Sequence, residues 1–106
     1  AKKLCEMMVK GEFIDCSLSM KCFKYDALLL TDKEKWQEHV FAEIRKDYKK
    51  MLDAGATSVW ETIDGASAFG NAGSLCHGWS AIPVYYFNKN MCFATNNANI
   101  EVDSCI

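Results

Sequence analysis

The sequence predicts an all-α protein built from antiparallel helical hairpins. Apolar residues recur at three- and four-residue steps over long stretches, as on the buried face of a helix. Glycines stand where those stretches stop, and no pair of strands is required to explain the pattern. Half of the 106 residues are hydrophobic, so the chain can bury the core of one domain.

The first two helices are expected over Ala1 to about Gly11 and over Ser17–Leu30. The helical pattern starts at the first residue, and Gly11 suits the left-handed position that follows a helix. Because the chain starts inside a helix, we expect a piece of a longer protein. Apolar residues cover most of the circumference of the second helix, which is typical of a helix buried between other elements.

A third helix is expected from the capping box Thr31–Glu34, in which the threonine hydroxyl is the predicted N-cap, to about Asp53. Gly55 ends it. Its charged residues are expected to form a solvated face, with His39 among them. The predicted buried stripe consists of Trp36, Val40, Ile44, Tyr48, Met51 and Leu52.

After Gly55 the sequence predicts a short extended segment, a glycine-rich loop and one more helix. Ser74 is the predicted N-cap of that helix, which would run from Leu75 to about residue 90 with a kink at Pro83. Residues 1–93 form the helical part in this prediction. Residues 94–106 are an Asn-rich polar tail without helical periodicity.

Composition excludes several classes of protein. Twelve basic and fourteen acidic residues give a net charge of −2 without a basic stripe, so no nucleic-acid partner is expected. No apolar run approaches the roughly 20 residues that span a bilayer. The six cysteines contain no C-x-x-C pair, and neither a metal nor a cofactor is expected. An even cysteine count also suits disulfides, but cysteines within helical patterns favour a reducing compartment, the cytoplasm.

Trp60, Glu61 and His77 flank the glycine-rich loop and are the candidate site residues. A tryptophan beside a carboxylate suits carbohydrate, because sugars stack flat C–H faces on indoles and their hydroxyls need polar partners. The carboxylate can also act as a general base toward water. The alternative is an exposed glutamate beside a core tryptophan, with a structural histidine.

Two other interpretations of the last helix remain open. Trp79 and the run Tyr85–Phe87 could line a sugar cleft or belong to the core. Cys76 and His77 could be a nucleophile and its base, although adjacent helical residues point about 100° apart and pair poorly. A thiol enzyme of this kind would be inactivated by alkylation.

Two motifs in this order resemble the end of the catalytic domain in six-hairpin glycosidases, above all the α-L-rhamnosidase-type glycoside hydrolases. They are GATSVWE at 55–61 and SLCHGW at 74–79, and the resemblance covers about residues 1–93. It implies part of an (α/α)6 toroid whose loops hold the sugar at one end. It also implies that Glu61 is the catalytic base of an inverting hydrolysis, and that Trp60 and His77 shape the sugar-binding subsite. Trp79 is a further candidate for substrate binding.

The resemblance has clear departures. The family's general acid lies on an upstream segment that this chain lacks, and inversion needs two carboxyl groups roughly 6.5–9.5 Å apart. Asp64 is close to Glu61 in sequence but lacks the family context for that role. A fragment of a glycoside hydrolase, inactive alone, is therefore expected, and a partial toroid should self-associate through the exposed face of 17–30. The rival hypothesis is a non-catalytic module that binds carbohydrate or protein.

Overall fold

The computed structural model describes residues 1–95, with side chains described through Lys89. This part of the chain contains helices joined by turns and loops, and no strand, which confirms the all-α prediction. The toroid stays a prediction. The helices are α1 (Lys2–Val9), α2 (Lys21–Thr31), α3 (Lys33–Asp53), α4 (Ala68–Asn71) and α5 (Ile82–Thr95), with 3-10 turns at η1 (Leu18–Met20), η2 (Gly65–Ser67) and η3 (Gly78–Ala81).

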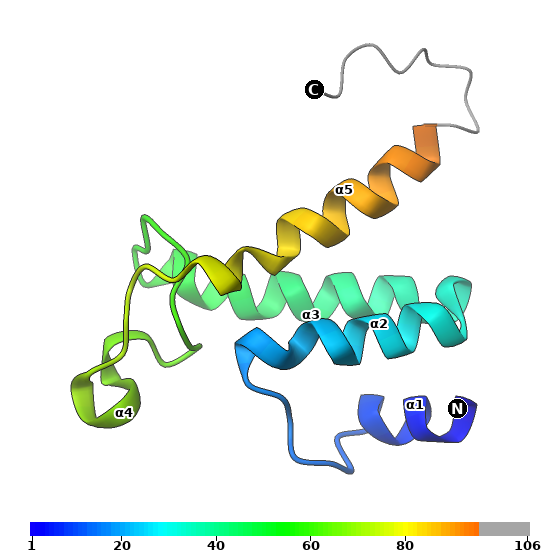
Figure 1. Ribbon diagram of the computed structural model, residues 1–106, viewed down its shortest axis with the longest axis horizontal. Helices are drawn as coiled ribbons and strands as arrows, with labels where there is room; N and C mark the ends of the chain where they lie inside the picture. The colour runs from blue at the N-terminus through cyan, green and yellow to red at the C-terminus, as the bar shows by residue number, and fades with distance from the viewer. Residues whose placement is uncertain (96–106) are drawn as a thin grey trace.

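Helices α2 and α3 form an antiparallel hairpin with a single residue between them (Figure 1). Helix α1 lies along one side of this hairpin, and α5 crosses it obliquely on the other side. The long connection that carries α4 leaves the end of α3 and returns to η3 at the same end of the hairpin. The candidate site lies on this connection.

The core is formed where α1, α2, α3 and α5 meet. The Tyr86 hydroxyl on α5 lies 2.8 Å from Asp26 Oδ1 and 2.9 Å from Cys22 O on α2, and it donates toward these acceptors. Burial, together with the bond to Asp26, raises the pKa of Tyr86. Phe87 stacks on Phe41 of α3 with ring centroids 4.9 Å apart. The buried cluster comprises Cys5, Tyr25, Leu28, Trp36, Val40, Phe41, Ile44 and Tyr86.

The two predicted glycine stops are confirmed. Gly11 and Gly55 have φ values of 73° and 81°, which an L side chain rarely adopts. At the end of α3, Gly55 N donates to Leu52 O at 2.9 Å and Ala56 N donates to Met51 O at 3.0 Å. These two bonds form a Schellman motif, which satisfies carbonyls that the helix leaves open.

The predicted N-cap of α3 was wrong by one residue. Asp32 Oδ1 accepts from Lys35 N at 3.1 Å, whereas Thr31 is the last residue of α2. Since one residue joins the two helices, Thr31 stays helical and only Asp32 has the extended backbone that an N-cap needs. Leu52, predicted to be buried, is 70% exposed, because it follows Met51 around the end of the stripe.

The predicted last helix was also wrong at its start. Helix α5 begins at Ile82, and the residues before it form a loop and the turn η3. Pro83 therefore lies in the first turn of α5, where proline's missing N–H costs no helix bond and produces no kink. Helix α5 continues to Thr95, and the rest of the predicted polar tail lies outside the described residues.

Candidate functional site

The connection between α3 and α5 is closed at its neck by paired backbone bonds. Glu61 N donates to Ser74 O, and His77 N donates to Val59 O, both at 2.9 Å. Two segments far apart in the loop are therefore joined here, although no strand forms between them in the described part of the chain. The loop 62–73 that they enclose is held as a compact unit.

Glycines close the base of this loop by direct backbone contact. A Cβ on Gly73 would lie 1.9 Å from the carbonyl oxygen of Gly65. A Cβ on Gly65 would lie 2.7 Å from the indole of Trp60, and Gly65 also has a φ of 57°. Trp60 is half-buried against this glycine backbone, so its ring packs the base of the loop.

The Glu61 carboxylate is fixed by the opposite side of the neck. Its Oε2 accepts from Ser74 N at 3.1 Å, in addition to the backbone bond between the same two residues. Within the described chain, Oε1 has no hydrogen-bond partner, and the side chain is half-buried. The carboxylate is therefore oriented and keeps one oxygen able to accept a new hydrogen bond.

Trp79 and His77 lie beside Glu61. The Trp79 and His77 rings pack edge to face with centroids 3.9 Å apart. Trp79 Nε1 donates a long bond of 3.4 Å to the carbonyl oxygen of Glu61. Trp79 is 49% exposed, so part of its indole is open to solvent. The structure thus brings Glu61, His77 and Trp79 together at the neck of the loop, with Trp60 packed against the glycine backbone at its base.

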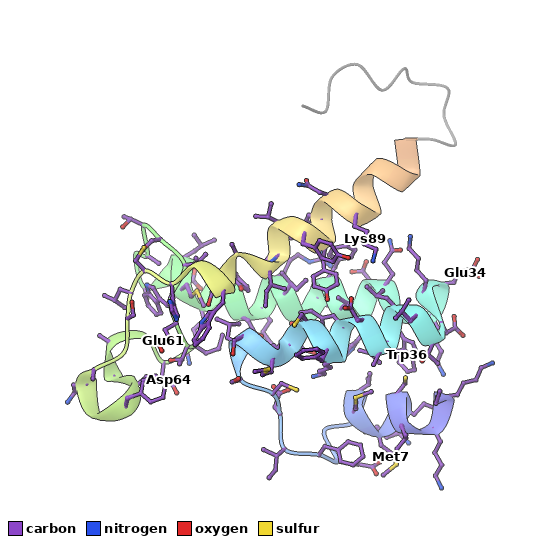
Figure 2. The ribbon with its side chains drawn as sticks, in the orientation of Figure 1. Met7, Glu34, Trp36, Glu61, Asp64 and Lys89 are labelled. Atoms are coloured by element: carbon purple, nitrogen blue, oxygen red, sulfur yellow. The ribbon has the colours of Figure 1, made fainter. Side chains whose placement is uncertain are left out.

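Asp64, the nearest acid in sequence to Glu61, lies at the same end of the molecule (Figure 2). Its carboxylate is exposed and forms a surface ion pair of 3.6 Å with Lys50 of α3. Cys76 is exposed on the loop, and its N–H donates to Ser74 Oγ at 3.3 Å. His77 precedes η3 in an extended conformation, so the prediction that it lies inside a helix was wrong.

Sequence reasoning missed a buried ionic cluster between α2 and α3. Lys21 is 5% exposed, and its Nζ lies 2.8 Å from Glu43 Oε1 and 2.6 Å from Asp47 Oδ2. Lys24 Nζ lies 2.9 Å from Glu43 Oε2. The prediction of a solvated charged face is therefore wrong for Glu43 and Asp47. Their i,i+4 spacing was the available signal, because two acids so placed repel unless a cation joins them.

Opposing effects act on the ionisation of this cluster. Burial alone would raise the pKa of Glu43, but hydrogen bonds and charge from Lys21 and Lys24 outweigh it and lower the pKa below its ordinary value. Burial alone would lower the pKa of Lys21, but its bonds to Asp47 and Glu43 outweigh it and raise that pKa. The pairs are therefore ionised at neutral pH.

Two cavities lie away from the predicted site. One of about 800 Å³ lies between α1, the loop that follows it and α3. The other, of about 400 Å³, is an apolar crevice between α3 and α5. Neither is lined by Trp60, Glu61, His77 or Trp79.

Among the side chains that the structure describes, no group of three or more His, Cys, Asp or Glu is placed to hold a metal ion. Within residues 1–95, no helix combines the length and apolarity of a bilayer-spanning segment. Comparison of the chain with known protein families, curated proteins and solved structures finds no match.

Proposed function

We propose that this chain is part of the catalytic domain of a glycoside hydrolase similar to the α-L-rhamnosidase type. In that role it contributes a sugar-binding surface and the general base. The observation that supports this most is the half-exposed indole of Trp79 fixed against His77 and beside Glu61. The GATSVWE and SLCHGW motifs supply these residues, and their backbones pair at the loop neck.

The arrangement suits a terminal deoxy sugar. An indole face removes the flat C–H side of a pyranose from water, and a C6 methyl group adds to that apolar contact. The free Oε1 of Glu61 and the imidazole of His77 are then the acceptor and donor for sugar hydroxyls. Trp60 stabilises the loop from beneath and acts on sugar binding through the position of Glu61.

In the parent enzyme Glu61 would activate the water that inverts the anomeric carbon. Inversion also requires a protonated acid on the leaving-group side, roughly 6.5–9.5 Å away. Asp64 does not fill this role in the proposal, because its carboxylate pairs with Lys50 at the surface. The chain alone is therefore expected to bind sugar and not to hydrolyse glycosides.

We also propose a reducing setting such as the cytoplasm. Cys5 Sγ lies 3.7 Å from Ala27 O, and Cys22 Sγ lies 3.6 Å from Ser19 O. Thiols donate in these contacts, as small groups inside the helical core do. Oxidation of either thiol to a disulfide would remove its donor proton.

Calorimetric titration with methyl α-L-rhamnoside tests the sugar proposal. We expect millimolar binding by the unaltered chain and loss of binding in Trp79→Ala, because the substitution removes the stacking face. Glu61→Gln should keep the bond from Ser74 N and lose at most about 1–3 kcal/mol of binding, the size of a charged hydrogen bond. Tyr85→Ala is the matched control, since Tyr85 is an aromatic residue of similar exposure on α5.

Two results would count against the proposal. One is a chain that binds no rhamnoside although it is folded. The other is equal weakening by Trp79→Ala and Tyr85→Ala, which would indicate non-specific aromatic contact. Tight binding to a protein, unaffected by Glu61→Gln, would favour the alternative of a helical interaction module.

A specific observation favours self-association as a second property. The outward face of α2 and η1 carries Met20, Phe23 and Leu30 at helical spacing, and these residues are 52%, 69% and 83% exposed. The face of this helix that a further hairpin would cover is therefore open within the described chain. Such a stripe is typical of a surface that another helix covers.

We expect light scattering to detect dimers that dissociate on dilution, and Phe23→Ser to shift the equilibrium toward monomer. Val84→Ser is the control, because Val84 is 61% exposed on α5 and lies outside the stripe. A monomer at millimolar concentration, or an equal effect of both substitutions, would contradict association through α2.

A further inference from the structure

The 800 Å³ groove has one apolar wall and one charged floor. Its wall comes from α1 and the following loop, where Leu4, Phe13 and Ile14 are 56%, 47% and 98% exposed. Its floor is one face of α3, with lining residues at i, i+3, i+4, i+7 and i+8 spacing. These floor residues are His39, Ala42, Glu43, Lys46 and Asp47. A volume of this size lies within the usual range for small-molecule sites, roughly 300–1,000 Å³.

The acids that line the groove already have partners. Asp15 pairs with Lys21 and Lys24 at 3.3 and 3.2 Å. At shorter distances, Glu43 binds both lysines and Asp47 binds Lys21. The pKa of Asp15 is lowered as well, because the two lysines outweigh the effect of burial. The charges of these carboxylates are therefore balanced by Lys21 and Lys24, and the carboxylates have little attraction for a cationic ligand.

The lining also carries one cation without a partner among the described residues and one shielded imidazole nitrogen. Lys46 has neither an ion pair nor a hydrogen bond to any described residue. His39 Nε2 is shielded from solvent without a hydrogen bond, and lies 3.6 Å from Glu43 Oε2. Lys46 and His39 are two turns apart on the same face of α3, with the small side chain of Ala42 between them.

We propose that this groove binds an amphipathic anion, a small molecule with an extended apolar body and one carboxylate. The apolar body covers Leu4, Phe13 and Ile14, and the carboxylate pairs with Lys46. The small side chain of Ala42 leaves space on the groove floor for the apolar part of the ligand. This site is independent of the sugar surface, because the groove and the loop neck share no lining residue.

Titration of the full chain with sodium decanoate below its micelle concentration, followed by backbone amide shifts, tests the site. We expect saturable shifts in α1 and the middle of α3. Lys46→Gln should weaken binding about three- to fivefold, the size of one exposed ion pair. Ala42→Phe should remove measurable binding by filling the floor without a change of charge. Lys50→Gln, on the same helix outside the groove, should leave the affinity unchanged.

A matched ligand series separates charge from apolarity. Decylammonium has the same chain with a cationic head and should bind at least about tenfold more weakly than decanoate, because the attraction between the ligand head and Lys46 becomes a repulsion of similar size. The proposal is overturned by equal binding of the two ligands, by binding that survives Ala42→Phe, or by no binding of decanoate. Binding to anionic vesicles without binding to free decanoate would also overturn it. If the Ala42→Phe variant fails to fold, the effect of Lys46→Gln and the comparison of decanoate with decylammonium still test the proposal.

Discussion

Replacing Lys21 with methionine is expected to destabilise the fold by about 3–5 kcal/mol, the cost of removing one member of a buried ion pair. Lys21 joins Glu43 and Asp47, whose side chains are each 13% exposed. Lys24 still neutralises Glu43 after the substitution, but Asp47 then keeps no cationic partner among the described residues. Methionine preserves the length and the packing of the lysine stem, so the loss reports the charge.

Urea unfolding followed by circular dichroism measures this effect, with Lys46→Met as the control. Lys46 lies on the same face of α3 as Glu43 and Asp47 but has no partner in the described chain. Its substitution should change the free energy of unfolding by less than about 0.5 kcal/mol. Lys21→Met combined with Asp47→Leu should recover part of the loss, because the stranded charge is removed. Equal destabilisation by both single substitutions would contradict the role of the cluster.

The same cluster sets a pH window for stability. The pKa of Glu43 is lowered from its ordinary 4.5, so its contribution is complete above that pH and is lost as pH falls through the folded-state value. The pKa of Lys21 is raised from 10.5, so its contribution is complete below that pH and is lost at higher pH. The free energy of unfolding should therefore fall outside about pH 4.5–10.5, and less steeply in Lys21→Met.

Gly73→Ala is expected to open the loop that presents Glu61. The new Cβ would lie 1.9 Å from the carbonyl oxygen of Gly65, a backbone atom that cannot rotate away. Ser74, the next residue, makes both bonds that fix Glu61, so separation of the glycines should break them. We expect faster amide exchange throughout 59–77 and loss of rhamnoside binding, with little change in α3 exchange.

Two other glycines provide graded controls. A Cβ on Gly78 or on Gly70 would meet no atom within 4 Å. Gly70 has a φ of 69°, so Gly70→Ala should cost about 1 kcal/mol of local strain, whereas Gly78→Ala should be close to neutral. If Gly78→Ala accelerated amide exchange in 59–77 as strongly as Gly73→Ala, steric contact between Gly65 and Gly73 would not be the cause of the faster exchange.

Much of the helical frame could be predicted from local patterns. The stops at Gly11 and Gly55 and the full length of α3 follow from backbone conformation and apolar spacing, which act over one or two turns. The start of α5 could not be predicted in this way, because Ser74, the expected N-cap, makes other hydrogen bonds. Its N–H binds the Glu61 carboxylate, and its Oγ accepts from Cys76 N to close a turn rather than cap a helix.

The arrangement of the candidate site residues could be predicted only in part, for the same reason. His77 and Trp79 are close in sequence and meet by local geometry, whereas their position beside Glu61 depends on bonds between segments 13 or more residues apart. The cluster around Lys21 was missed because the partners in α2 and α3 pair only after the hairpin closes. Composition along one helix does not reveal such a pairing.

We propose that Trp79, with His77 and Glu61, forms a carbohydrate-binding surface. Indole N–H resonances test it most directly, because Trp36, Trp60 and Trp79 occupy different environments in one chain. During titration with L-rhamnose, we expect a saturable shift of the Trp79 Nε1–H resonance, a smaller shift for Trp60 and none for the buried Trp36. L-mannose, which replaces the C6 methyl with a hydroxymethyl group, should bind more weakly. A Trp79 resonance that stays unmoved at saturating sugar, or moves no more than that of Trp36, would contradict the claim.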